Sequence, residues 1–265
     1  MFGRRKIAAL VAEFLGTGFL TLLILSVQRS TIGVPFFVAA AAGLTIALTV
    51  FAFFRVSGAH FNPALTIGLW TARKISTVKA ILYVVLQLAG AYVAYSLYSY
   101  FVHNKLQSIG GKFSGRILTA EAVGTGLLAF GYAAAIYQRF TIGAAAAVAG
   151  LAYMLGSIAA SSASVGLINP AVALGVKAWV LGTYVLGPVI GAIVGVNLYG
   201  LLFAGNDAED AASDVTGLKS LQSRVGKNAK VTQTQTVVTS VKPLRKARDT
   251  TAKPRAATKR AVRKV

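Results

Sequence analysis

The chain has 265 residues, of which 55% are hydrophobic and 13% charged, and its formal net charge is +20. Residues 1–205 hold only two acidic side chains, whereas residues 206–265 hold the other five and 14 of the 27 Lys and Arg residues. This division excludes an ordinary soluble protein. It predicts an apolar membrane domain over residues 1–205 and a disordered basic cytoplasmic tail over residues 206–265.

Six segments have the length and composition of membrane-spanning helices, which need about 20 apolar residues to cross the hydrocarbon region. In chain order they are residues 7–27, 35–54, 80–101, 118–137, 141–160 and 180–204. Two shorter apolar pieces, residues 63–72 and 170–178, each follow an Asn-Pro-Ala triplet. A helix of about ten residues covers about 15 Å, which is half of the roughly 30 Å hydrocarbon core. We therefore expect two half-helices that enter the membrane and do not cross it.

An internal repeat relates the two parts of the membrane domain. Asn62-Pro63-Ala64 recurs 107 residues on as Asn169-Pro170-Ala171, and the stretch from Ala12 to Gly18 recurs 108 residues on, from Ala120 to Gly126. Matches in the same order at nearly one offset indicate a duplicated unit. Each repeat, about 7–101 and 118–204, has three full spans, so the second must be inverted relative to the first. Inverted repeats with discontinuous helices that meet at the midplane are typical of transport proteins.

The residue types of the two triplets favour helix starts. Asn is a strong N-cap, and Pro suits the first helical position because it has no N–H to leave unpaired. The Asn62 and Asn169 side-chain oxygens then serve the helix starts, and their NH2 groups remain free to donate. Two positive helix ends that face each other at the midplane disfavour cations there. An ordinary Asn-capped soluble helix accounts for one Asn-Pro pair, but not for two in register in a membrane domain.

Glu13 and Glu121 lie inside predicted spans, where a carboxylate is costly and is normally paired in the interior. We expect each to accept backbone N–H bonds from a half-helix loop, and a proton relay is the alternative. His60, two residues before Asn62, either lines the inner pore mouth or packs within the loop. The chain has no cysteine and only two isolated histidines, and it shows no nucleophile–base pair or phosphate loop. We therefore expect no metal site, no cofactor and no enzyme.

Lys and Arg set the expected orientation. With the N-terminus inside, the inner side receives most of them, including those of the tail. We expect a multi-pass protein of the plasma membrane with both termini in the cytoplasm.

With these motifs the chain resembles the aquaporin, or major intrinsic protein, family over residues 5–204. The resemblance implies an all-α membrane protein with six transmembrane helices plus two re-entrant half-helices in two inverted repeats. It also implies one pore per subunit, usually a homotetramer, and passive movement of water or small neutral solutes across the lipid bilayer. It adds Gln87 to the glutamates as a support of the loops. The motifs that carry it are Ser57-Gly58-Ala59-His60-Phe61-Asn62-Pro63-Ala64, the pairs Glu13–Thr17 and Glu121–Thr125, the residues Gln87, Gly90 and Ala91, and the pairs Gly187-Pro188 and Gly191-Ala192.

The chain departs from the family at the outer selectivity filter. Water-selective members resemble one another at this filter, which consists of an aromatic residue, a His, a small residue and an Arg. In this chain the family's spacing assigns Ala42, Ser157, Gly166 and Val172 to the four positions. Small side chains widen the constriction, and the loss of Arg removes a fixed charge and five N–H donors. We therefore expect passage of glycerol, urea or uncharged metalloid acids, and weaker exclusion of cations.

Two other functions stay open. The chain is a membrane scaffold if its basic tail recruits anionic lipid, nucleic acid or an acidic partner. It is a coupled transporter if its flux depends on a proton or sodium gradient.

Overall fold

The computed structural model describes residues 3–31, 33–109 and 111–204. The chain divides into two units, residues 1–204 and residues 205–265. The predicted disordered tail over residues 206–265 lies outside the described residues.

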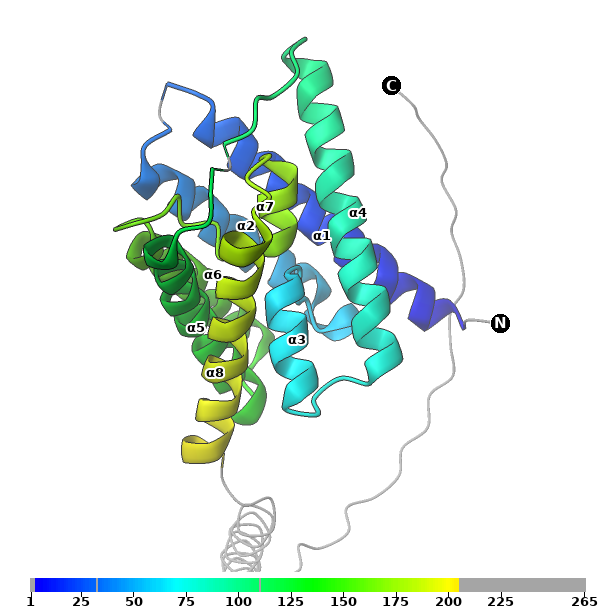
Figure 1. The fold of residues 1–265 in the computed structure, drawn as a ribbon. Coiled ribbons are helices and arrows are strands. Elements are labelled where there is room, and N and C mark those ends of the chain that lie inside the picture. Colours follow the sequence, from blue (N-terminus) through cyan, green and yellow to red (C-terminus); the bar gives the residue numbers. More distant parts are fainter. Residues whose placement is uncertain (1–2, 32, 110, 205–265) are drawn as a thin grey trace, which may run out of the picture. The chain divides into compact units, whose positions relative to one another are not determined.

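The described residues form helices and connecting loops, with no strand among them. Six segments are long and apolar enough to cross a membrane: α1, α2, α4, α5, α6 and the continuous η1–α8 segment. Two short helices, α3 and α7, follow the Asn-Pro-Ala triplets, and this arrangement confirms the predicted all-α fold class (Figure 1). The bounds are α1 Arg4–Gln28, α2 Pro35–Ser57, α3 Pro63–Thr71, α4 Thr77–Phe101, α5 Gly115–Tyr137, α6 Ile142–Ala160, α7 Pro170–Gly175, η1 Leu181–Val185 and α8 Leu186–Phe203.

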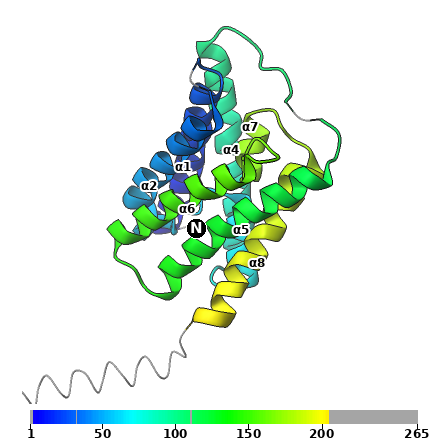
Figure 2. The same cartoon turned by 90° about the vertical axis from the view of Figure 1, so that its left-hand side faces the viewer.

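The packing of the helices follows the inverted repeat. In the first repeat α1 packs against α4 and α2, and in the second α5 packs against α8 and α6 (Figures 1 and 2). Helices α2 and α6 join the two repeats. Each short helix packs against the last span of the other repeat, α3 against α8 and α7 against α4. The half-helices are therefore held by contacts between the repeats.

Small residues allow pairs of helices to cross closely, at corresponding positions in the two repeats. A Cβ added to Gly90 would collide with the carbonyl oxygen of Phe14, and one added to Gly191 would collide with that of Ala122. Backbones that approach this closely are typical of membrane helices, where small residues drive packing. Large apolar side chains such as Leu44, Phe51 and Leu201 instead lie exposed on the outside of the helices.

One predicted helix bound is wrong, and the last span has its predicted position but begins with a different type of helix. The second half-helix ends at Gly175 and not at residue 178, because Lys177 takes a left-handed backbone conformation and the Ala178 N–H bonds to the Ala173 carbonyl. The last span begins as a π-helical turn, η1. Pro188 has no N–H to donate to the carbonyl of Tyr184 four residues earlier, which favours a wider turn there.

Candidate functional site

The two Asn side chains start the half-helices in nearly the same geometry. Asn62 has φ −153° and ψ 118°, and Asn169 has φ −152° and ψ 113°. In each case Oδ1 accepts a hydrogen bond from the N–H two residues on, Ala64 or Ala171, at 2.9 Å. Both triplets therefore begin a helix, as their residue types predict.

The same two side chains also join the two half-loops, which are the non-helical segments that lead into α3 and α7. Asn62 Nδ2 donates to the Ile168 carbonyl at 2.9 Å, and Asn169 Nδ2 donates to the Phe61 carbonyl at 2.9 Å. An amide group has two N–H donors, so each Asn uses one of them in this bond. The expectation of a wholly free NH2 is thus corrected to one remaining N–H.

Glu13 lies beneath the first half-loop and is fully buried. Its carboxyl oxygens accept from the backbone N–H groups of His60 at 3.0 Å and Phe61 at 2.7 Å. They also accept from Ser57 Oγ at 2.6 Å and from Gln87 Nε2 at 2.8 Å. The carboxyl group thereby satisfies donors that a non-helical loop leaves without helical partners.

Glu121 has the corresponding place in the second repeat. It accepts from the backbone N–H groups of Leu167 at 3.1 Å and Ile168 at 2.6 Å, and from the Ser164 hydroxyl. Ile168 and its counterpart Phe61 both have left-handed backbones, with φ 44° and 50°. Such a backbone costs about 1–2 kcal/mol for a residue with a side chain, so the carboxyl bonds hold the half-loops in conformations that they would otherwise avoid.

His60 lies in the loop between α2 and α3, outside the six spanning helices. Its Nδ1 is 3.1 Å from Thr66 Oγ1, and its ring packs edge-on against Tyr83. It lines a cavity of 360 Å³ together with the basic side chains of Arg55, Lys74 and Lys79. Burial, and then the charge of Lys79, lower the pKa of His60 to about 3. The ring is therefore neutral at physiological pH, and it both packs the loop and faces the cavity.

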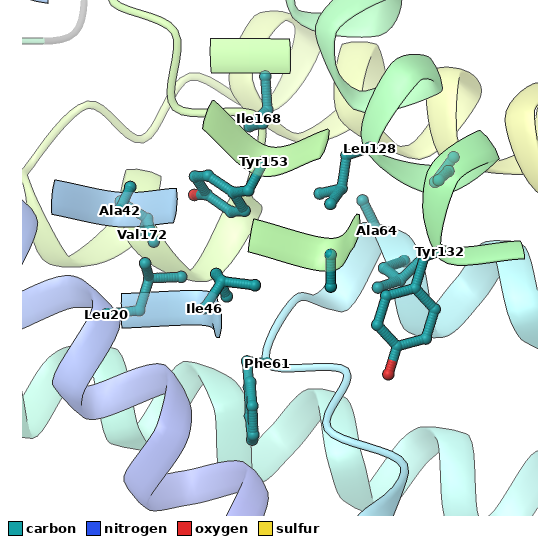
Figure 3. Packing of buried hydrophobic residues seen from close by; sticks show 14 of the residues in the cluster. Leu20, Ala42, Ile46, Phe61, Ala64, Leu128, Tyr132, Tyr153, Ile168 and Val172 are labelled. Carbon is teal, nitrogen blue, oxygen red and sulfur yellow. The ribbon is translucent and has the colours of Figure 1, made fainter. Parts of the chain in front are cut away.

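The four predicted filter residues are buried, and two of them touch. Ser157 Oγ on α6 donates to the Gly166 carbonyl at 2.6 Å. Gly166 has φ 66°, a left-handed conformation that suits glycine. Ala42 on α2 and Val172 on α7 lie in the same part of the buried cluster (Figure 3).

Comparison with known proteins decides the family. The sequence profile described as "Major intrinsic protein" matches residues 4–199. Aquaporin Z of Photorhabdus laumondii is 32% identical over 224 residues, which cover 74% of this chain and 97% of that protein. The chain belongs to the major intrinsic protein family.

Two further comparisons agree with this family. Aquaporin AqpM of Methanothermobacter thermautotrophicus is 32% identical over 60% of this chain and 73% of that protein. The X-ray structure of the aquaglyceroporin from Plasmodium falciparum matches with a TM-score of 0.64 at 23% identity, over 74% of this chain and 96% of that chain, and supports the fold. As a major intrinsic protein with six apolar helices, the chain is a multi-pass membrane channel for water or small solutes and not an enzyme.

Two buried tyrosines of this major intrinsic protein lie outside the sequence motifs. Tyr153 on α6 and Tyr132 on α5 are almost fully buried, and their hydroxyls donate to carbonyls of the two half-loops. A signal was present in the sequence, because Tyr153 lies four residues before Ser157 and so faces the same side of its helix.

Proposed function

We propose that this chain conducts water and small uncharged solutes passively along a path between Asn62 and Asn169. The observation that carries this proposal is the reciprocal pair of bonds from each Asn amide to the opposite half-loop. These bonds fix both side chains where the two short helices begin. The second N–H of Asn62 is left to donate to a passing molecule, whereas the Asn169 side chain also interacts with the Tyr153 hydroxyl. Water and small neutral solutes carry the oxygen acceptors that such donors suit.

The proposed filter consists of Ala42, Ser157, Gly166 and Val172. None of these four side chains is large, charged or aromatic, which supports a wide outer mouth that accepts glycerol, urea or uncharged metalloid acids. With Val172 in place of Arg, exclusion of cations rests on the helix starts and the Asn pair. Because α7 has only six residues, its dipole is small, and we expect cation exclusion to be weaker than a filter Arg would give.

We place the channel in the plasma membrane with both termini in the cytoplasm. The distribution of Lys and Arg supports this orientation, and the family supports a homotetramer of subunits with one pore each. We assign residues 1–205 to the channel domain and residues 206–265 to a cytoplasmic tail that attracts an anionic membrane surface, at about 1 kcal/mol per basic residue.

Stopped-flow light scattering on proteoliposomes tests the conduction. Shrinkage in an impermeant osmolyte reports water flux, and recovery in glycerol or urea reports solute entry. We expect both to exceed those of empty liposomes and of a variant with Trp at Asn62 and Asn169. Flux no faster than that of empty liposomes would overturn the proposal.

The 14 basic residues of the tail support a second candidate, a scaffold that recruits anionic lipid, nucleic acid or an acidic partner. Deletion of residues 206–265 separates the two functions. A channel still conducts after the deletion, whereas a scaffold loses its binding to anionic vesicles or to nucleic acid.

A further inference from the structure

Two buried tyrosines donate to the half-loop carbonyls on either side of the Asn pair. The Tyr153 hydroxyl donates to the Leu167 carbonyl at 3.0 Å. The Tyr132 hydroxyl donates to the Ala59 carbonyl at 3.1 Å and also to the carbonyl of Gly58. Both rings belong to the second repeat, and each is nearly inaccessible, at 1% and 2% exposure.

The hydrogen bonds of the second half-loop indicate in which order the side chains lie along the proposed conduction path. Three consecutive carbonyls, those of residues 166, 167 and 168, accept from Ser157, Tyr153 and Asn62 respectively. Ser157 is a proposed filter residue and Asn62 belongs to the Asn pair. Tyr153 therefore lies between the filter and the Asn pair, one helical turn from Ser157 on the same face of α6. In Figure 3 its ring projects toward the region that holds Ala42 and Val172.

The first half-loop has the corresponding order on the inner side. Ile136 lines the 360 Å³ cavity together with His60, and we call this cavity the inner cavity because the proposed orientation places it on the cytoplasmic side. Tyr132 lies one turn before Ile136 on the same face of α5. The Tyr132 hydroxyl bonds to the carbonyl of Ala59, and the carbonyl of Phe61 accepts from Asn169. Tyr132 thus lies between the inner cavity and the Asn pair.

We infer that Tyr132 and Tyr153, in addition to the four proposed filter residues, determine which solutes pass. This inference rests on the proposed conduction between Asn62 and Asn169. A phenol ring is far larger than the Ala and Ser side chains at the filter, so it narrows the path on both sides of the Asn pair. The tyrosine hydroxyl also bonds to backbone carbonyls. A solute that loses its water shell on entering the path would need these carbonyls as hydrogen-bond acceptors.

Replacement of the two rings by Val tests the inference in the stopped-flow assay. We expect Tyr132→Val/Tyr153→Val to raise the ratio of glycerol to water permeability at least about tenfold over the unaltered chain, because pore width decides entry of the larger solute. Each single variant is expected to raise this permeability ratio by a smaller factor, since the other ring still narrows the path.

Tyr199→Val is the matched control. Tyr199 on α8 is also a buried tyrosine, but its hydroxyl accepts from the Gln138 amide next to the end of α5 and, among the described residues, has no bond to a half-loop carbonyl. The ratio is expected to stay unchanged in this variant, although its stability decreases.

The outcomes separate the inference from the proposed function. If the unaltered chain conducts water and the double variant keeps its permeability ratio, the inference fails and the conduction stands. If the unaltered chain is silent but the double variant conducts, the proposed function is overturned, and the inference fails with it, because the rings then close the path to every solute and do not select among solutes. If neither conducts, both fall. Should the Val variants not fold, Tyr132→Leu/Tyr153→Leu retains more volume, and an unchanged ratio in that folded variant overturns the inference.

Discussion

Replacement of Glu13 by Ala removes the acceptor of four buried donors. These are the backbone N–H groups of His60 and Phe61, the Ser57 hydroxyl and the Gln87 amide, at 2.6–3.0 Å from the carboxyl oxygens. An unsatisfied buried donor costs about 1–3 kcal/mol. The four share one site, so their costs do not simply add, and we expect a loss of about 4–8 kcal/mol. That is a large part of the roughly 5–15 kcal/mol by which a typical protein is stable.

The Gln variant gives a graded comparison at the same position. Glu13→Gln keeps one acceptor oxygen, which can serve Phe61 and Gln87. Its NH2 then faces Ser57, whose hydroxyl can turn to accept, and the His60 N–H loses its acceptor. One lost bond of this kind costs about 1–3 kcal/mol, so the expected order of stability is unaltered chain, Glu13→Gln, Glu13→Ala.

The two tryptophans allow the two half-helices to be followed separately. Trp70 lies in α3, and Trp179 lies four residues after the end of α7. In single-tryptophan variants unfolded by heat in detergent, Glu13→Ala should change the Trp70 emission at a lower temperature than the Trp179 emission. Glu121→Ala should have the reverse effect. Equal unfolding temperatures for Glu13→Ala and the unaltered chain would refute the reasoning.

Three other results are expected. Val172→Arg places a long cation at the proposed filter and should lower glycerol permeability at least about tenfold in proteoliposomes, whereas unchanged glycerol flux would argue against the filter assignment. Gly90→Val and Gly191→Val force a side chain against the backbone of a neighbouring span, at a cost of about 3 kcal/mol or more. Size-exclusion chromatography should show loss of folded protein for both but not for Gly143→Val, since a Cβ at Gly143 meets no atom within 4 Å. Because the pKa of His60 lies below its ordinary value of 6.5, at about 3, the ring stays neutral across physiological pH and water permeability should be constant there; a transition centred near pH 6.5 would contradict this.

The repeat made most of the fold predictable from the sequence. Two Asn-Pro-Ala triplets in register predicted two half-helices, because the N-cap and the proline act locally and need no tertiary context. The ends of these helices were less predictable. Lys177 ends α7 by taking a left-handed conformation, which is unusual for lysine, and residue types alone predicted a longer apolar helix.

The partners of Glu13 and Glu121 were predictable in kind but not in detail. A buried carboxyl group needs hydrogen-bond donors, and a non-helical loop has N–H groups without backbone partners. A glutamate inside a span and a loop nearby are therefore expected to bond to each other. Which N–H groups face the carboxyl group depends on the left-handed residues Phe61 and Ile168, which place consecutive N–H groups toward one point. Neither residue type suggests such a backbone.

The tyrosines escaped prediction because they break the repeat. Gly43 and Gly150 are 107 residues apart and meet where α2 crosses α6, so Tyr153 corresponds to Ile46 in the first repeat. By the 108-residue offset of the glutamates, Tyr132 corresponds to Ile24. The residues that match between the two repeats belong to the structures that both halves share, namely the half-helices and their carboxyl supports. Selectivity between solutes instead needs a particular ring at a particular carbonyl, and symmetry does not require the partner repeat to supply one. Side chains of one repeat that bond to a half-loop carbonyl, and have no counterpart in the other repeat, are therefore where selectivity should be sought first in this chain.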